Sequence, residues 1–191
     1  MRFFFDSNIV TYISYFEGFL TADEKGKDEE YIECEHFYEE VTQQKISKED
    51  EKMIKSLRKL YLADEWSHFD WLLSDTAIEE ILSIRCDKKR RNHYDFLDRI
   101  IEHRNIVLEE QSLSFSGKLN PIFSKFSKKD FNDCIQCSEA IEYESDCFIT
   151  NDKRFIRKCE RIDMNIFVTR IQDVPIFRDG THYKTVPKYI T

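Results

Sequence analysis

Short apolar runs alternate along the chain with longer stretches in which apolar residues recur at helical spacing. The first run, RFFF at residues 2–5, ends at Asp6, and a helical stripe follows almost at once. Similar runs at 147–150 and 165–169 predict two more short strands, and NIVLE at 105–109 is also typical of a strand. Because helical stretches separate these runs, they indicate a parallel sheet covered by helices on both faces.

The helical stretches have recognisable starts. Ser47 is followed three residues later by an acid, Asp50, which is the pattern of a capping box, and an apolar stripe comes after it. Ser74 precedes another stripe in the same way. We expect helices in the following stretches: 9–20, 53–61, 78–85, 89–103, 134–141 and 154–161.

The composition supports one domain with a substantial core. The chain has 191 residues, 41% of them hydrophobic and 14% aromatic, with only 4 Gly and 3 Pro. We therefore predict a single domain over residues 1–191. No run approaches the roughly 18 apolar residues that cross a bilayer, and Asp6 interrupts the N-terminal run too early for a signal peptide. We expect a cytoplasmic protein with no membrane partner.

The net charge of −8 would disfavour a nucleic-acid partner if it were spread over the whole chain. Most of the acidity lies between residues 17 and 65, which hold 15 acidic and 8 basic residues. Basic clusters occur elsewhere, at 88–91, 125–129 and 153–161. The overall charge therefore does not exclude a phosphate-rich substrate.

Two of the six cysteines, Cys134 and Cys137, form a CxxC pattern that is half of a zinc site or a redox pair. No second CxxC and no paired histidines complete a zinc site. Both cysteines fall on the same face of a predicted helix as Ser138 and Ile141. We therefore favour buried, reduced thiols over a metal or redox site.

Four acidic residues lie near the ends of predicted strands or on the helices next to them. Asp6 follows the first strand, and Asp152 follows a later one. Glu80 lies on the helix after Ser74, and Asp133 lies in the first turn of another helix. Because the carboxyl ends of parallel strands meet at one edge of a sheet, we expect these carboxylates to converge there. Such like charges repel one another unless a divalent cation neutralises them, and oxygen ligands suit Mg²⁺ or Mn²⁺.

Three stretches resemble the successive acidic motifs of the PIN-domain family, which are metal-dependent nucleases with a Rossmann-like fold. They are FFFDSNIV, DTAIEEIL and DCIQCSEAIEYESDCFITNDKRF, and the resemblance covers most of residues 1–20 and 72–172. It implies a three-layer α/β/α fold with a central, mostly parallel sheet of about four or five strands. The path between the first two motifs is much longer than in compact members of the family, so we expect a helical insertion at about 21–70.

The resemblance also implies roles for individual residues. The residues expected to be both catalytic and metal-binding, with Mg²⁺ or Mn²⁺ as the cofactor, are Asp6, Glu80, Asp133 and Asp152. Ser7 and Asn151 are expected to support the site. The residues expected to bind the substrate backbone are Lys153, Arg154 and Arg157. Glu79 and Glu80 point about 100° apart on a helix, so only one faces the site. We favour Glu80 because Ile81 and Leu82 follow it, as in the family pattern.

The activity that the resemblance implies is that of a metal-dependent endoribonuclease hydrolysing phosphodiester bonds of RNA, with DNA as the less favoured substrate. It leaves open an antitoxin or other protein partner, and a homodimer. The alternative is a catalytically inactive module of this fold that binds protein or RNA. Asn8 argues against a phosphatase that needs a second acid two positions after Asp6, and no GxGxxG motif supports a dinucleotide-binding enzyme.

Overall fold

Four short strands of mostly apolar residues form one parallel sheet. The strands are β1 (Arg2–Phe5), β2 (Asp70–Leu73), β3 (Cys147–Ile149) and β4 (Phe167–Thr169), in the order β2-β1-β3-β4. In the register of this sheet, Phe4 of β1 pairs with Leu72 on one side and with Phe148 on the other. All three side chains are buried, which fits a parallel sheet covered on both faces.

This computed structural model describes the backbone of residues 1–83, 87–174, 176–179 and 182–185, and the side chains of residues 1–64, 68–83 and 98–174. In that part of the chain the α-helices are α1 (Ser7–Thr21), α2 (Lys27–Thr42), α3 (Lys48–Ser67), α4 (Asp75–Leu82), α5 (Asp87–Glu110), α6 (Phe131–Glu142) and α7 (Lys153–Cys159). Three short 3₁₀ turns also occur, η1 (Pro121–Phe123), η2 (Lys128–Asp130) and η3 (Ile171–Asp173).

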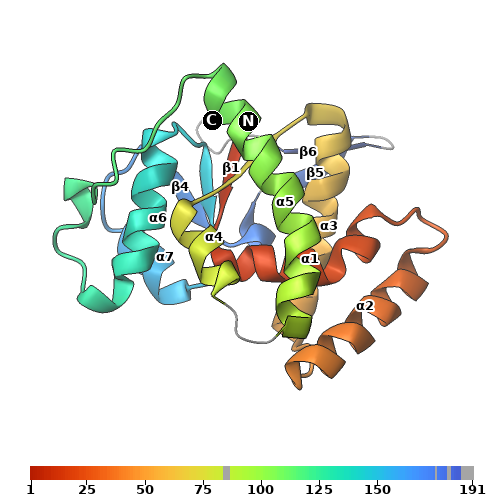
Figure 1. Ribbon diagram of the computed structural model, residues 1–191. Helices are drawn as coiled ribbons and strands as arrows, with labels where there is room; N and C mark the ends of the chain where they lie inside the picture. Colours follow the sequence, from red (N-terminus) through yellow and green to blue (C-terminus); the bar gives the residue numbers. More distant parts are fainter. Residues whose placement is uncertain (84–86, 175, 180–181, 186–191) are drawn as a thin grey trace.

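The helices form a layer on each face of the sheet (Figure 1). Phe3 and Phe5 of β1 pack into a core cluster with residues of α1 and α3, whereas Phe4 packs into a second cluster with residues of α6 and α7. Successive residues of a strand point to opposite faces, so these three phenylalanines serve both layers. The result is the α/β fold with a parallel sheet that the alternation of strands and helices predicts.

The acidic stretch at about 21–70 forms α2 and α3, and both pack on the rest of the protein. Tyr38 of α2 and Met53, Ile54 and Leu57 of α3 are buried in the same cluster as Phe3. The capping box at the start of α3 is present, with Ser47 and Asp50 exchanging hydrogen bonds. The expected insertion at about 21–70 is thus helical, and these contacts pack it against the sheet layers.

One expected strand is part of a helix, and one observed strand was not expected. Residues 105–109 belong to the last turns of α5, and the segment DWLL, for which no strand was expected, forms β2. The apolar run at 105–109 has helical spacing with the positions before it, since Ile100, Arg104 and Val107 are all buried. A run of this length does not distinguish a strand from a buried helix segment, and the neighbouring contacts decide.

A further antiparallel pair, β5 (Ile176–Asp179) and β6 (His182–Thr185), follows the parallel sheet and contacts α3. No helix in the described residues is both long enough and apolar enough to span a membrane. The cysteines of the described part are free, and Cys134 and Cys137 are buried in α6, as expected for thiols on its inner face.

Candidate functional site

Two of the predicted acidic residues follow neighbouring strands. Asp6 comes directly after β1, and its backbone nitrogen donates to the carbonyl oxygen of Ile149 at 3.0 Å, which extends the ladder between β1 and β3. Asp152 begins α7, where its Oδ1 accepts from the backbone nitrogens of Arg154 at 2.7 Å and Phe155 at 2.9 Å. Both acids therefore lie at the carboxyl edge of the sheet, where α1 and α7 begin (Figure 1).

Asp6 is held by three polar side chains. Its carboxylate is 1% exposed and accepts hydrogen bonds at Oδ2 from Thr150 Oγ1 at 2.8 Å and from Asn8 Nδ2 at 3.3 Å. The hydroxyl of Ser7 lies 3.2 Å from the other oxygen. Burial raises the pKa of Asp6, and these hydrogen bonds oppose that shift. The carboxylate is therefore fixed in position within a largely apolar sheet edge.

Glu80 of α4 joins this group through Ser7. The hydroxyl of Ser7 donates to Glu80 Oε2 at 2.6 Å, across 73 residues of sequence. The amide of Asn132, in the first turn of α6, donates to Glu80 Oε1 at 2.7 Å. Glu79 is exposed to solvent, so Glu80 is the one of the two adjacent acids that faces Asp6. Three segments that are distant in sequence thus meet at one carboxylate.

Asp133 of α6 lies near the other acids and is partly buried. Its pKa is raised to about 7, first by burial and then by the negative charges of Asp6, Asp152, Asp130 and Glu80. In the described residues no hydrogen bond to the Asp133 carboxylate offsets this repulsion. The negative charges of the other three predicted acids therefore act on Asp133 and disfavour its ionisation unless positive charge is added.

The donor set suits a hard divalent cation, although the acids do not form a ready coordination shell. Among the described residues, no three or more acidic, histidine or cysteine side chains are grouped to hold a metal ion. The carboxylates of Glu80 and Asp152 accept hydrogen bonds from protein donors. The carboxylate of Asp133 accepts none from the described residues. By oxygen chemistry and by charge, the residues fit Mg²⁺ or Mn²⁺.

The basic residues expected to bind substrate are largely paired with acids. Lys153 lies 2.5 Å from Glu49 of α3, and Arg154 lies 2.9 Å from Asp130. Arg157 is exposed, and it forms no ion pair with the described residues. The first two cations are thus partly neutralised by the protein itself.

Asp130 is a residue that the sequence did not single out as part of the site. It is fully buried and accepts from the hydroxyl of Ser127 at 2.5 Å, while Lys158 and Arg154 pair with its two oxygens. Burial alone would raise the pKa of Asp130, but hydrogen bonds from Lys158 and Ser127 and the charge of Arg154 lower it to about 2. The signal in the sequence was Ser127-Lys-Lys-Asp130, which has the spacing of a capping box.

A hollow of about 410 Å³ adjoins Asp152 on the side of α3. Glu49, in the first turn of α3, pairs across its rim with Lys153 and with Arg170 at 3.3 Å. Asn151, expected as a supporting group, donates its amide to Met53 Sδ at 2.7 Å. The residues that line this hollow are Ser47, Glu49, Asp50, Met53, Asn151, Asp152, Lys153 and Arg154.

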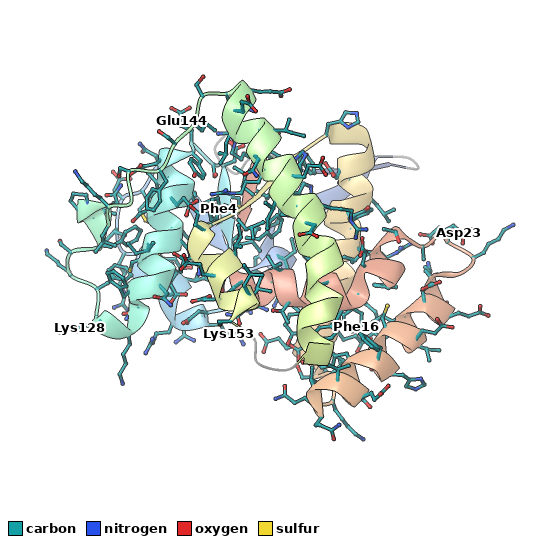
Figure 2. The ribbon with its side chains drawn as sticks, viewed as in Figure 1. Phe4, Phe16, Asp23, Lys128, Glu144 and Lys153 are labelled. Atoms are coloured by element: carbon teal, nitrogen blue, oxygen red, sulfur yellow. The ribbon has the colours of Figure 1, made fainter. Side chains whose placement is uncertain are left out.

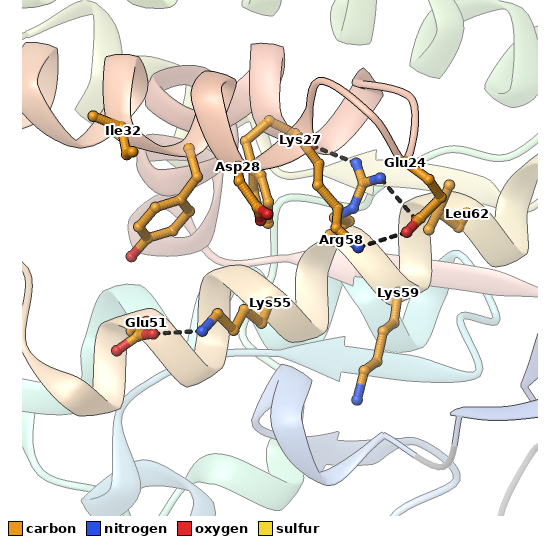
Figure 3. Close-up of a pocket in the computed structure, with 11 residues that line it drawn as sticks. Glu24, Lys27, Asp28, Ile32, Glu51, Lys55, Arg58, Lys59 and Leu62 are labelled. Carbon is orange, nitrogen blue, oxygen red and sulfur yellow. Dashed lines mark hydrogen bonds and ion pairs between the residues drawn. The ribbon is translucent and has the colours of Figure 1, made fainter.

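A larger hollow of about 600 Å³ lies between α2 and α3, away from these acids (Figure 3). At its base the guanidinium of Arg58 donates to the carbonyl oxygens of Phe19, Leu20 and Ala22. Glu24 pairs with Arg58 at 3.3 Å. These contacts tie the two helices to the end of α1, so the charged groups here have a structural role.

Four segments far apart in sequence thus place acidic side chains at the carboxyl edge of one parallel sheet. The side chains of the basic cluster at 88–91 are not among those that the structure describes. Comparison with protein-family models, with curated proteins and with solved structures finds no match for the chain.

Proposed function

We propose that the chain is a metal-dependent endoribonuclease with a PIN-like fold. The observation that carries this proposal is the hydrogen-bonded link from Ser7 to Glu80 to Asn132, beside the buried carboxylate of Asp6. It joins three sequence segments at the edge of the sheet where parallel α/β proteins bind their ligands. The order of the acidic motifs along the chain, with its resemblance to PIN nucleases, supports the same activity.

The residues proposed to hold Mg²⁺ or Mn²⁺ are Asp6, Glu80, Asp133 and Asp152. When bound, such an ion lowers the pKa of a water molecule and polarises the scissile phosphate for attack on phosphorus. Thr150 and Asn8 keep the Asp6 carboxylate in place through their hydrogen bonds. Substrate positioning falls to the basic residues at the start of α7.

Proton transfer needs a carboxylate that is not fully occupied by protein donors. Asp133 meets this requirement, since burial and neighbouring charges oppose its ionisation and no hydrogen bond within the described residues offsets them. We assign Asp133 the role of accepting the proton of the attacking water, because both oxygens of Glu80 already accept from Ser7 and Asn132. Arg157, in the last turn of α7, is exposed and forms no ion pair with the described residues, so a phosphate can bind it without displacing an acid there.

The test is cleavage of a fluorescent single-stranded RNA in Mn²⁺. The wild-type protein and Asp163→Asn should cut it, because Asp163 is exposed and precedes β4 rather than following a strand. EDTA and Asp6→Asn should each abolish cutting, while the circular dichroism spectrum of Asp6→Asn stays that of the wild type. Cutting that persists in EDTA or in Asp6→Asn would refute the proposal.

A catalytically inactive module that binds RNA or protein is the second candidate. It is favoured by the finding that no group of acids in the described residues is arranged to hold a metal ion. A titration with Mn²⁺ separates the two functions, because a ligand that binds only the folded state raises the melting temperature. A rise that Asp6→Asn abolishes supports the nuclease, and an unchanged melting temperature up to millimolar Mn²⁺ supports the inactive module.

A further inference from the structure

Two large apolar side chains remain exposed beside the acids. Leu82, the last residue of α4, is 43% exposed and lies two positions after Glu80. Phe131, the first residue of α6, is 53% exposed and lies two positions before Asp133. Among the Phe, Tyr and Trp side chains that the structure describes, Phe131 is the only exposed one. The other Phe, Tyr and Trp rings of known burial lie wholly or partly inside the protein.

A polar contact next to Phe131 holds the start of α6 in place. Asn132, next to Phe131, donates to Glu80 Oε1 at 2.7 Å, and α4 packs against α6 (Figure 1). The contact fixes the start of α6, which carries Phe131, against α4. An exposed ring at the start of a helix that also carries Asp133 suits a ligand with both apolar and charged parts.

The backbone at Phe131 is anchored from beneath. The preceding residue, Asp130, is fully buried and is held by Ser127, Arg154 and Lys158. A ring on such a support is presented to solvent with little backbone freedom left to lose when it binds.

Positive charge lies close to this ring. Lys128 and Lys129 are exposed in the turn directly before Phe131. Lys128 and Lys153 lie at one end of the molecule, opposite Glu144 (Figure 2). The start of α6 thus carries an exposed ring directly after two exposed lysines.

We propose that Phe131 is a stacking platform for one nucleobase of single-stranded RNA. The π-face of any base stacks on an aromatic ring, so the platform tolerates different bases while it fixes the position of the neighbouring phosphate. Only the statement that this phosphate is the one cleaved rests on the proposed nuclease function.

The test uses tryptophan emission in EDTA, so that it depends on neither metal nor cleavage. Phe131→Trp titrated with a single-stranded oligoribonucleotide should lose emission relative to the wild type, which has two tryptophans of its own. Ile106→Trp, at a position of α5 that is 48% exposed, is the matched control and should not respond. An abasic oligonucleotide of equal length should leave both variants unchanged.

Equal responses from Phe131→Trp and Ile106→Trp, or quenching by the abasic strand, would overturn the platform. As a second measurement, Phe131→Ala should weaken binding of the oligoribonucleotide about tenfold, whereas Phe131→Tyr keeps wild-type affinity. Both variants alter an exposed side chain, and an unchanged melting temperature verifies that they fold. RNA cleavage by the wild type without the Phe131→Trp response would reject the platform alone, and the response without cleavage would reject the nuclease alone.

Discussion

Two hydroxyl groups hold the acidic side chains of the site in their positions. Thr150 donates to Asp6, and Ser7 bridges Asp6 and Glu80. The positions of Asp6, Asp133 and Asp152 were predictable because each follows a strand or opens a helix, whereas Glu80, near the end of α4, was chosen by the family pattern. Their donors were harder to recognise, since a serine or threonine after a strand is as often a helix cap as a partner of a distant carboxylate. Thr150, immediately before Asn151 and Asp152, is such a case.

Asp130 provides a test of electrostatics at a single residue. Its lowered pKa means that it stabilises the folded state above the ordinary pKa of 3.8, and that this stabilisation is lost as the pH falls toward about 2. Asp130→Asn should therefore cost about 2 kcal/mol at pH 7, and the difference from the wild type should shrink between pH 4 and pH 2. Urea unfolding followed by circular dichroism across this range measures it.

The control for this prediction is Asp163→Asn, which removes an exposed acid. It should change the free energy of unfolding by less than about 0.5 kcal/mol at any pH. If Asp130→Asn and the wild type keep a constant difference down to pH 2, the pairing of Asp130 with Lys158 and Arg154 does not set its pKa.

At the level of secondary structure, α3 links the acidic segment to the site. Its capping box places Glu49 in the first turn, where Glu49 pairs with Lys153 and Arg170 at the rim of the 410 Å³ hollow. The hydrogen bond from Lys153 lowers the pKa of Glu49, so this carboxylate is charged at neutral pH. It competes with any phosphate for the same two cations.

Removing that competitor should strengthen RNA binding. Glu49→Gln should raise the affinity for single-stranded RNA about two- to fivefold in EDTA, because Lys153 and Arg170 become available to phosphates. Fluorescence anisotropy at two salt concentrations measures the effect, which should diminish as salt increases. Glu51→Gln, which removes a partner of Lys55 on the same helix, is the matched control. Equal affinities of the two variants would show that Glu49 does not compete with RNA.

Sequence reasoning reached most elements but not all of them. β1, β3, β4 and the capped start of α3 follow from apolar runs and from one Ser-x-x-Asp pattern. β2 was missed because DWLL follows the end of α3 without a turn rich in glycine or proline, so nothing marks it off from the helix. The end of α5 was misread because its β-branched residues favour strands, and tertiary packing of Val107 overrides that preference.

For the molecule as a whole, the acidic segment and the sheet share one core. Ile54 of α3 and Ile149 of β3 are buried in the same cluster, together with Phe3 and Ile9. Such a cluster is expected to unfold as one unit, whatever the origin of α2 and α3. The long path between the first two acidic motifs is then part of the stability of the protein, although the sequence alone presents it as an addition.

Ile54→Ala should accordingly destabilise the protein as much as Ile149→Ala, by about 3–4 kcal/mol each. Both should unfold in a single transition with an unchanged denaturant dependence. Ile32→Ala, on the exposed face of α2, should cost less than about 0.5 kcal/mol. Urea unfolding measures all three, and a separate early transition in Ile54→Ala would mean that α2 and α3 unfold independently of the sheet.

The two neighbours of the inner strand β1 are synthesised at very different times. β1 pairs with β2 and with β3, and the contact between Asp6 and Thr150 spans 144 residues. A ribosome adds about 5–20 residues per second, so β1 waits roughly 7–30 s for its second neighbour. Throughout that interval Phe3, Phe4 and Phe5 offer an open strand edge, which is the kind of surface that chaperones bind on nascent chains.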